Sequence, residues 1–291
     1  MEFSQSLPRA LAFGLAAVLS LSVAVAQPAK QTAKEPAKAE AKSKAKAEEF
    51  VPQSGQAGKD VVWVPTPQAL VDRMLDMARV TKDDYVIDLG SGDGRTVITA
   101  GKRGVKAKGI EYNPDMVELS KRNAQKEGVN VEFVRGDIFE SNFSDATVIT
   151  LFLLPSLNVK LRPILLDMKP GTRVVSNSFD MGDWTPDQTI EAGGDCSSWC
   201  RGHFWMIPAK VEGVWQTPIG ELKLEQKYQM LTGSLQIGEA RAPVTGKLLG
   251  NDIVLTAGRN IFTGKVDGAK MEGTATDSGK ESKWTVTRGA K

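Results

Sequence analysis

Between residues 60 and 208, short apolar runs alternate with segments that have the periodicity of amphipathic helices. Apolar runs predict strands at 85–89, 106–112, 131–138, 146–154 and 173–179, and residues 188–208 supply two more. Helices are predicted between them, at 66–78, 95–102, 113–128 and 156–168. The run at 146–154 is almost wholly apolar, which is typical of a central strand covered on both faces. This order of elements predicts an α/β fold with a doubly wound, mostly parallel seven-stranded sheet.

The first of these helices has a clear start signal. Thr66 is placed to cap it and Pro67 suits the first helical position. Leu70, Met74 and Met77 recur on one face, so we expect that face to pack on the sheet in front of the first strand.

From Lys210 onward the pattern changes to period two. Leu222 and Leu224, followed by Tyr228 and Met230, alternate with charged or polar residues, and turn sequences recur at short intervals. Such alternation is typical of half-buried antiparallel strands. Residues 209–291 are therefore predicted to form a separate β-meander domain of about six strands, with Val214, Trp215 and Trp284 closing a small barrel.

The N-terminal region has two parts. Residues 10–26 are apolar, too short for a clear membrane span, and end in Ala24-Val25-Ala26, so we expect residues 1–26 to be a signal peptide that is cleaved before Gln27. The protein would then be exported, in a bacterium to the periplasm; an uncleaved membrane anchor is the alternative. Residues 27–58 are rich in Ala, Lys and Glu and cannot bury a core. They predict a disordered linker, either a solvated spacer or a weak contact with an anionic membrane surface, ahead of a folded domain at 59–208.

Charge and cysteine content narrow the possible partners. The net charge is +2, and the six Lys and four Glu of residues 27–49 account for it. The folded part is near neutral, so no nucleic-acid partner is predicted.

The only cysteines, Cys196 and Cys200, form a disulfide or remain free thiols after export. With the single histidine, His203, they lack a fourth ligand, so no metal site is predicted; His203 is expected to be a satisfied residue on a strand.

A glycine-rich turn follows the strand at 85–89. Gly90, Gly92 and Gly94 stand at every second position, with Ser91 between the first two. A side chain at these positions would keep the backbone away from a ligand, and glycine permits dihedrals closed to other residues. The next helix directs its free N–H groups and positive dipole end toward this turn. A tight turn beneath a bound ligand is predicted.

Carboxylates mark the ends of three consecutive predicted strands. Asp88 lies in the first, Glu111 ends the second and Asp137 follows the third. A carboxylate at the second strand's tip can accept both hydroxyls of a ribose. Asp137 stands where an adenine amino group needs an acceptor. We expect the three to line one crevice.

Together these motifs resemble the class I, seven-stranded S-adenosylmethionine (SAM)-dependent methyltransferases. The resemblance covers residues 60–208. It implies that the turn residues and Asp88 hold the methionine part of SAM and that Glu111 binds the ribose. It also implies that Asp137 and Ile138 face the adenine and that Tyr112 lies against it.

A nicotinamide cofactor is the competing interpretation of the turn. Its fingerprint places the third glycine one residue later than the spacing found at 90–94. Asp93 would repel a diphosphate but suits a cationic sulfonium. The Tyr-x-x-x-Lys pair of short-chain dehydrogenases is also absent from the sequence.

A closer resemblance lies in the segment V-P-T-P at 64–67, which precedes a helix and then D-L-G-S-G-D-G-R. This order is similar to the lysine methyltransferases of the ATP-synthase c subunit and of the adenine nucleotide translocase. It implies a protein lysine as acceptor and a segment around Trp63 and Thr66 that closes over the cofactor. The N-P-P-Y motif of enzymes that methylate amide or adenine nitrogens is missing after the strand at 146–154.

The chemistry requires a neutral amine in line with the methyl group. Asp180 and Asp183 follow the fifth strand at the expected substrate rim, where either would accept a proton or orient the amine, unless both are simply solvated loop carboxylates. Two other functions stay open. One is methylation of a small O-, N- or S-nucleophile in a deep pocket; the other is an exported SAM-binding envelope protein without turnover. The oligomeric state is not predicted.

Overall fold

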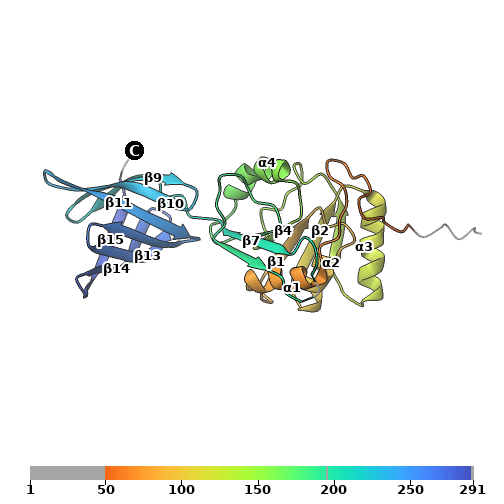
Figure 1. Ribbon diagram of the computed structural model, residues 1–291. Coiled ribbons are helices and arrows are strands. Elements are labelled where there is room, and N and C mark those ends of the chain that lie inside the picture. The colour runs from red at the N-terminus through yellow and green to blue at the C-terminus, as the bar shows by residue number, and fades with distance from the viewer. Residues whose placement is uncertain (1–49, 195, 290–291) are drawn as a thin grey trace, which may run out of the picture. The chain divides into compact units, whose positions relative to one another are not determined.

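The computed structural model describes residues 50–194 and 196–289 (Figure 1). The expected signal peptide and residues 27–49 of the expected linker lie outside the described residues. Among the helices that are described, none has the length and apolar character needed to span a membrane.

The methyltransferase-like part contains four helices and seven strands. The helices are α1 (Gln68–Met77), α2 (Arg95–Lys102), α3 (Pro114–Lys126) and α4 (Pro155–Leu166). The strands are β1 (Tyr85–Leu89), β2 (Lys106–Glu111), β3 (Glu132–Arg135), β4 (Val148–Leu151), β5 (Arg173–Asn177), β6 (Gln188–Glu191) and β7 (Arg201–Met206). The order of elements matches the prediction from hydrophobic pattern.

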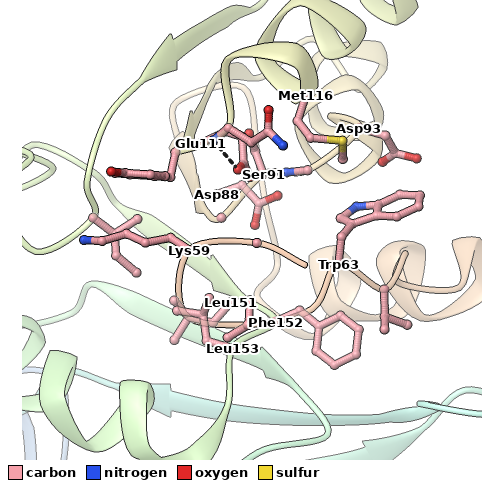
Figure 2. A pocket seen from close by; sticks show the side chains of 18 of the residues that line it. Lys59, Trp63, Asp88, Ser91, Asp93, Glu111, Met116, Leu151, Phe152 and Leu153 are labelled. Carbon is pink, nitrogen blue, oxygen red and sulfur yellow. Dashed lines mark hydrogen bonds between the residues drawn. The ribbon is translucent and has the colours of Figure 1, made fainter. Parts of the chain in front are cut away.

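The seven strands form one sheet in the order β3-β2-β1-β4-β5-β7-β6. Strands β1 to β5 pair in parallel, and β7 runs antiparallel to β5 and to β6. The predicted doubly wound, mostly parallel sheet is confirmed. Because the parallel strands share one direction, the carboxyl ends of β1, β2 and β4 meet at one edge, around the cleft drawn in Figure 2.

Each face of the sheet carries its own apolar core. Helix α1 contributes Leu70, Val71, Met74 and Leu75 to one of them, as its sequence pattern predicts. The helix packs on α2, β5 and β7 and shares a core cluster with Val86 of β1, so it lies on the sheet as expected. Leu70 and Met74 lie beside Gly202 of β7, where a Cβ would be 3.4 Å from each side chain.

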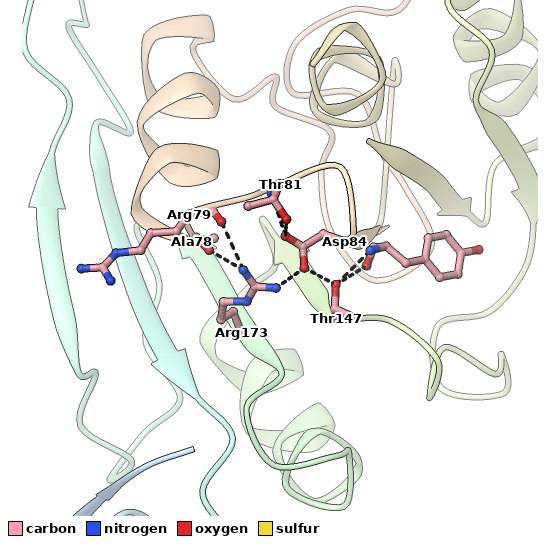
Figure 3. Close-up of polar contacts among 7 residues, drawn as sticks. Ala78, Arg79, Thr81, Asp84, Thr147 and Arg173 are labelled. Atoms are coloured by element: carbon pink, nitrogen blue, oxygen red, sulfur yellow. Dashed lines mark hydrogen bonds and ion pairs between the residues drawn. The ribbon is translucent and has the colours of Figure 1, made fainter. Parts of the chain in front are cut away.

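At the opposite end of the sheet, a buried ion pair ties α1 to the starts of the strands. Arg173 forms an ion pair with Asp84 and donates to the carbonyl of Ala78 at 2.8 Å (Figure 3). Asp84 also accepts from the backbone N–H of Thr81 at 2.7 Å and the hydroxyl of Thr147 at 2.7 Å. Burial by itself raises the pKa of Asp84, but these donors outweigh it and hold the pKa below the ordinary value.

The C-terminal part is a closed barrel of eight strands. They are β8 (Gly213–Thr217), β9 (Gly220–Lys227), β10 (Met230–Ile237), β11 (Ala240–Leu249), β12 (Asp252–Ala257), β13 (Asn260–Asp267), β14 (Lys270–Asp277) and β15 (Lys280–Arg288). Neighbours in sequence pair antiparallel, and β15 returns to β8. The predicted C-terminal antiparallel β domain is confirmed, with eight strands in place of about six.

The structure corrects two predictions about which residues face the inside of the barrel. Trp215 is fully buried in the barrel core, but Val214 is 36% exposed and lies on the outer face. The period-two alternation breaks at the turn near Tyr228, whose φ is 56°, so Met230 faces outward and is 53% exposed. Closure results from the register of Thr287 and Arg288 against β8.

Candidate cofactor site

A single cleft brings together the residues that the sequence pattern singles out at the strand ends (Figure 2). Asp88, Glu111 and Asp137 all line it, as the prediction of a shared crevice requires. The other predicted cofactor contacts in its lining are Thr66, Gly90, Ser91, Gly92, Tyr112 and Ile138. We call this space the cofactor cleft.

The turn after β1 depends on left-handed glycines. Gly90, Gly92 and Gly94 have φ values of 82°, 53° and 83°, which residues with a side chain rarely adopt. The N–H groups of Gly90 and Ser91 donate to the carbonyl of Ile110 at 2.8 and 3.1 Å. The turn is therefore fixed to the neighbouring strand β2.

The structure corrects the role expected for Gly94, which does not line the cofactor cleft. A Cβ at this position would lie 2.6 Å from the ring of Phe133 and 2.7 Å from Ser120. Gly94 thus allows α2 to pack close to β3 and α3. Gly109 of β2, which the sequence pattern did not single out, has a related role, because its Cβ would lie 2.4 Å from the hydroxyl of Ser91.

Asp88 is a buried carboxylate with little to neutralise it. It is 7% exposed and accepts a 2.6 Å hydrogen bond from the hydroxyl of Thr150 on β4. Burial raises the pKa of Asp88 to about 7; the Thr150 hydrogen bond opposes this shift, and the charges of Glu111 and Asp93 add to it. A cation bound beside Asp88 would relieve both the desolvation and the repulsion.

Glu111 braces the glycine turn. One of its carboxylate oxygens accepts from the N–H of Gly92 at 2.9 Å, and the other accepts from the N–H of Asn113 at 2.9 Å. Each oxygen keeps a second lone pair for a ribose hydroxyl. The hydroxyl of Ser91 is buried and has no hydrogen-bond partner among the described residues, so a polar ligand group in the cleft would satisfy it.

A segment ahead of α1 lies across the cleft. Residues 55–66, which we call the lid segment, fold back on themselves through backbone hydrogen bonds between Gln56 and Trp63 and between Gly58 and Val61. The indole of Trp63 covers Gly92, where a Cβ would lie 2.5 Å from the indole nitrogen. One side of the cleft carries Asp88, Asp93 and Glu111, and the other side is formed by Leu151, Phe152 and Leu153. Figure 2 shows Lys59 and Trp63 between these two sides.

The lid segment uses two groups that were expected to meet adenine. Lys59 forms an ion pair with Asp137, and the ammonium lies 4.9 Å from the ring centroid of Tyr112. The hydrogen bond from Lys59 is the main reason why the pKa of Asp137 falls below its ordinary value. With the lid segment in place the cleft has a volume of about 130 Å³, whereas ligand sites commonly measure about 300–1,000 Å³. The lid segment, which contributes residues 56–66 to the lining, therefore narrows the cleft.

The role expected for Thr66 is also revised. Pro67, not Thr66, is the cap residue of α1, and no side chain caps this helix. The Thr66 hydroxyl accepts from the side-chain amide of Asn177 at 3.2 Å, and its carbonyl accepts from Arg95 at 2.9 Å. Thr66 thus fastens the end of the lid segment to β5 and α2 while still lining the cleft.

The two proposed proton acceptors do not line the cofactor cleft. The Asp183 carboxylate accepts from Arg162 at 2.6 Å and Tyr228 at 2.7 Å and pairs with Lys227 at 3.0 Å. The pKa of Asp183 is strongly lowered, first by the Tyr228 hydrogen bond. Asp180 is exposed and accepts from the N–H of Gly182 at 3.1 Å. Asp183 therefore links Arg162 of α4 to Tyr228 and Lys227, and neither carboxylate lines the cofactor cleft.

The two cysteines and the histidine have structural roles. Cys196 and Cys200 are joined by a disulfide, and His203 is held by the hydroxyl of Thr189 at 2.9 Å, as a satisfied strand residue should be. Thr150 was missed, although a polar residue in an otherwise apolar strand was a usable signal.

The donor set fits S-adenosylmethionine, which brings a sulfonium and an ammonium group when bound. Asp88 and Asp93 offer negative charge at the glycine turn, Ser91 offers an unused hydroxyl, and Glu111 offers lone pairs at the ribose position. Asp137, which Lys59 holds in this structure, would be the acceptor for the adenine amino group. No positively charged side chain other than Lys59 and Arg95 lines the cleft among the described residues, and Arg95 is paired with Asp93.

Replacing Asp88 with Asn tests the electrostatics of the ligand-free cleft. Because the pKa of Asp88 is raised in the folded state, the native protein holds an extra proton between about pH 4 and pH 7, and its stability falls as pH rises through this interval. Asp88→Asn removes this penalty, so its gain in free energy of unfolding should be larger at pH 8 than at pH 5, by about 1–3 kcal/mol.

Urea unfolding of both proteins without SAM measures this difference. Asp145→Asn, at an exposed position, serves as the matched control and should change stability little at either pH. The same Asp88→Asn protein should bind SAM at least tenfold more weakly by calorimetry, for a loss of about 1.4 kcal/mol or more. An equal or smaller stability gain at pH 8 would contradict the assignment.

Comparison with known proteins places this cleft in a family. Residues 88–188 match the model of the ANTKMT methyltransferase domain. A protein-lysine N-methyltransferase of Saccharolobus islandicus is 46% identical over 136 residues, which are 45% of this chain and 84% of that protein. A lysine N-methyltransferase of Xenopus laevis that is named for the ATP-synthase c subunit is 33% identical over 46% of this chain and 60% of that protein, so the chain spans about three fifths of that relative.

A solved structure is also similar. It is titled an RNA methyltransferase from Salinibacter ruber in complex with S-adenosyl-L-homocysteine, is 51% identical, and matches over 51% of this chain and 96% of that chain with a TM-score of 0.47. The sequence match to the Saccharolobus enzyme extends over most of that protein. The matched domain of this chain, residues 88–188, includes the acidic strand ends described above. The chain therefore belongs to the ANTKMT family of methyltransferases, with S-adenosylmethionine as its methyl donor.

Proposed function

We propose that this enzyme methylates the side-chain amine of a lysine in a protein acceptor. The observation that carries the proposal is the cofactor cleft, which fits a cationic methyl donor and belongs to a domain that resembles protein-lysine N-methyltransferases over most of one relative's length. When bound, S-adenosylmethionine supplies an electrophilic methyl group on a sulfonium.

The residues after β4 suit an amine acceptor. Leu151, Phe152 and Leu153 form the wall of the cleft opposite the carboxylates (Figure 2). An apolar wall disfavours the charged form of an entering lysine and so lowers its pKa toward neutrality. The neutral amine has the lone pair that attacks, and its proton passes to water, because Asp183 is committed to its ion pairs.

Replacement of the N-P-P-Y motif also supports this choice. The chain reads Leu153-Leu154-Pro155 after β4, and Pro155 is the first residue of α4. The motif's asparagine or aspartate, which would bind a planar amide or base, has no counterpart there. Holding an amine in line by position supplies much of the rate without such a side chain.

Incubation with methyl-labelled SAM and an envelope extract tests the acceptor. We expect label in protein that survives acid hydrolysis as methyl-lysine, and we expect no label with Glu111→Ala, which removes the acceptor of the Gly92 N–H and frees the glycine turn. Label in nuclease-sensitive material or in the small-molecule fraction would assign another acceptor and refute the lysine proposal. Bound SAM without any transfer would favour the binding-protein alternative.

We also propose that the protein is exported and works in the periplasm, with an uncleaved membrane anchor as the alternative. The Cys196–Cys200 disulfide supports this location, because disulfides persist in oxidising compartments. In this proposal, the stretch ahead of the lid segment is a solvated spacer, and a weak contact of its lysines with an anionic membrane surface is the alternative.

The location is tested by N-terminal sequencing of the mature protein from fractionated cells. The sequence should begin at Gln27 and the protein should be in the periplasmic fraction. An intact Met1 in the cytoplasmic fraction would reject export, and an intact Met1 in the membrane fraction would establish the anchor.

A further inference from the structure

A second cavity adjoins the cofactor cleft and is walled by aromatic rings. Its volume is about 400 Å³, and it shares part of the lid segment and the residues Phe152 and Leu153 with the cleft. Phe152, Phe179 and Trp199 supply three rings to its lining. The ring centroids are 5.5–6.1 Å apart, so the rings form one packed cluster, which we call the aromatic wall.

Three separate elements fix the aromatic wall. Phe152 directly follows β4. The carbonyl of Phe179, just after β5, accepts from the Ser176 hydroxyl at 2.7 Å and the Asn158 amide at 3.2 Å, and both of these side chains are fully buried. Two rings are therefore held by the rigid sheet domain.

The third ring depends on the disulfide. Trp199 lies inside the loop that the Cys196–Cys200 disulfide closes, and its φ of 56° is in the left-handed region. A residue with a bulky aromatic side chain adopts that conformation only when its surroundings impose it. The loop is tied to the end of β6 by a 2.7 Å hydrogen bond from Ala192 to the carbonyl of Cys200. Trp199 is nevertheless 43% exposed, so much of the indole is open to solvent.

The chemistry of this cavity favours a cation. Its only charged lining residue among those described is Asp60, and no lysine, arginine or histidine lines it. Lys59 lies 3.9 Å from the Asp60 carboxylate, but both side chains are well exposed, so that contact is weak. Aromatic faces attract ammonium groups, and they suit methylated ammonium groups best because these are easily desolvated.

We propose that the aromatic wall is the acceptor subsite. Before transfer its rings pack against the aliphatic stem of the lysine, whose neutral amine faces the cofactor cleft, and after transfer they hold the methylated ammonium. Trp199 is a positioning residue in this subsite, and the Cys196–Cys200 disulfide keeps it there. Opening the disulfide by a dithiol reductant, which is itself oxidised to a disulfide as two cysteine thiols form, releases Trp199 and weakens acceptor binding. This inference rests on the proposed lysine methylation.

The test separates acceptor binding from cofactor binding. Trp199→Ala should raise the KM for a lysine-containing acceptor about fivefold or more, which corresponds to the loss of one cation–π contact, and should leave the dissociation constant of SAM within about twofold. Trp199→Phe should restore most of the acceptor affinity. Dithiothreitol should reproduce the Trp199→Ala effect in the wild-type protein and have no effect on Cys196→Ser/Cys200→Ser, which already lacks the bridge.

A binding probe makes the test independent of turnover. Nα-acetyl-trimethyllysine methylamide should bind the wild-type protein more tightly than the neutral Nα-acetyl-norleucine methylamide, and Trp199→Ala should remove the difference. Lysine methylation with an unchanged KM in Trp199→Ala would overturn the subsite and leave the proposed function standing. A parallel loss of SAM affinity would show a merely structural role and would also overturn it. Cation-selective binding without lysine methylation would refute the proposed function and support the subsite.

Discussion

The burial of one carboxylate without a cation beside it is the constraint on which this cleft depends. Asp88 lies on the central strand β1 with Glu111 and Asp93 nearby, and hydrogen bonds from the Thr150 and Thr96 side chains oppose the rise of its pKa. Without a ligand, this cleft lowers the stability of the folded protein, because desolvation and the acidic neighbours both disfavour the ionised form of Asp88. It becomes favourable when a positively charged ligand enters. The glycine turn, Glu111 and the apolar wall at the end of β4 line the same cleft and are arranged to contact that ligand.

The lid segment occupies part of the space that the ligand needs. Lys59 neutralises Asp137 and Trp63 covers Gly92, so each contact takes the place of one that the cofactor is expected to make. Ligand entry would thus replace the Lys59 ammonium at Asp137 with the neutral adenine amino group and bring a cation to Asp88. Thr66, through Arg95 and Asn177, fastens the far end of the segment to α2 and β5.

Local signals sufficed wherever neighbouring residues decide the outcome. The glycine turn and the strand-end carboxylates were predictable, since parallel strands bring their carboxyl ends to one edge. Predictions failed where distant contacts decide. Gly94 is needed for packing against Phe133. The Asp183 carboxylate is bound by Tyr228 and by the cations Arg162 and Lys227. The strand count of the barrel failed for a similar reason, because closure depends on the register of its last strand against its first and not on the alternation within any strand.

The most direct test of this account is a carbon-13 NMR titration of the Asp88 carboxyl group with and without SAM. In the free protein Asp88 should titrate near its raised pKa of about 7, and saturation with SAM should move that pKa down toward the ordinary carboxyl range, because the bound cation stabilises the ionised form. An Asp88 carboxyl that titrates at the same pH in both states would contradict the claim that this carboxylate is buried to receive a cationic methyl donor.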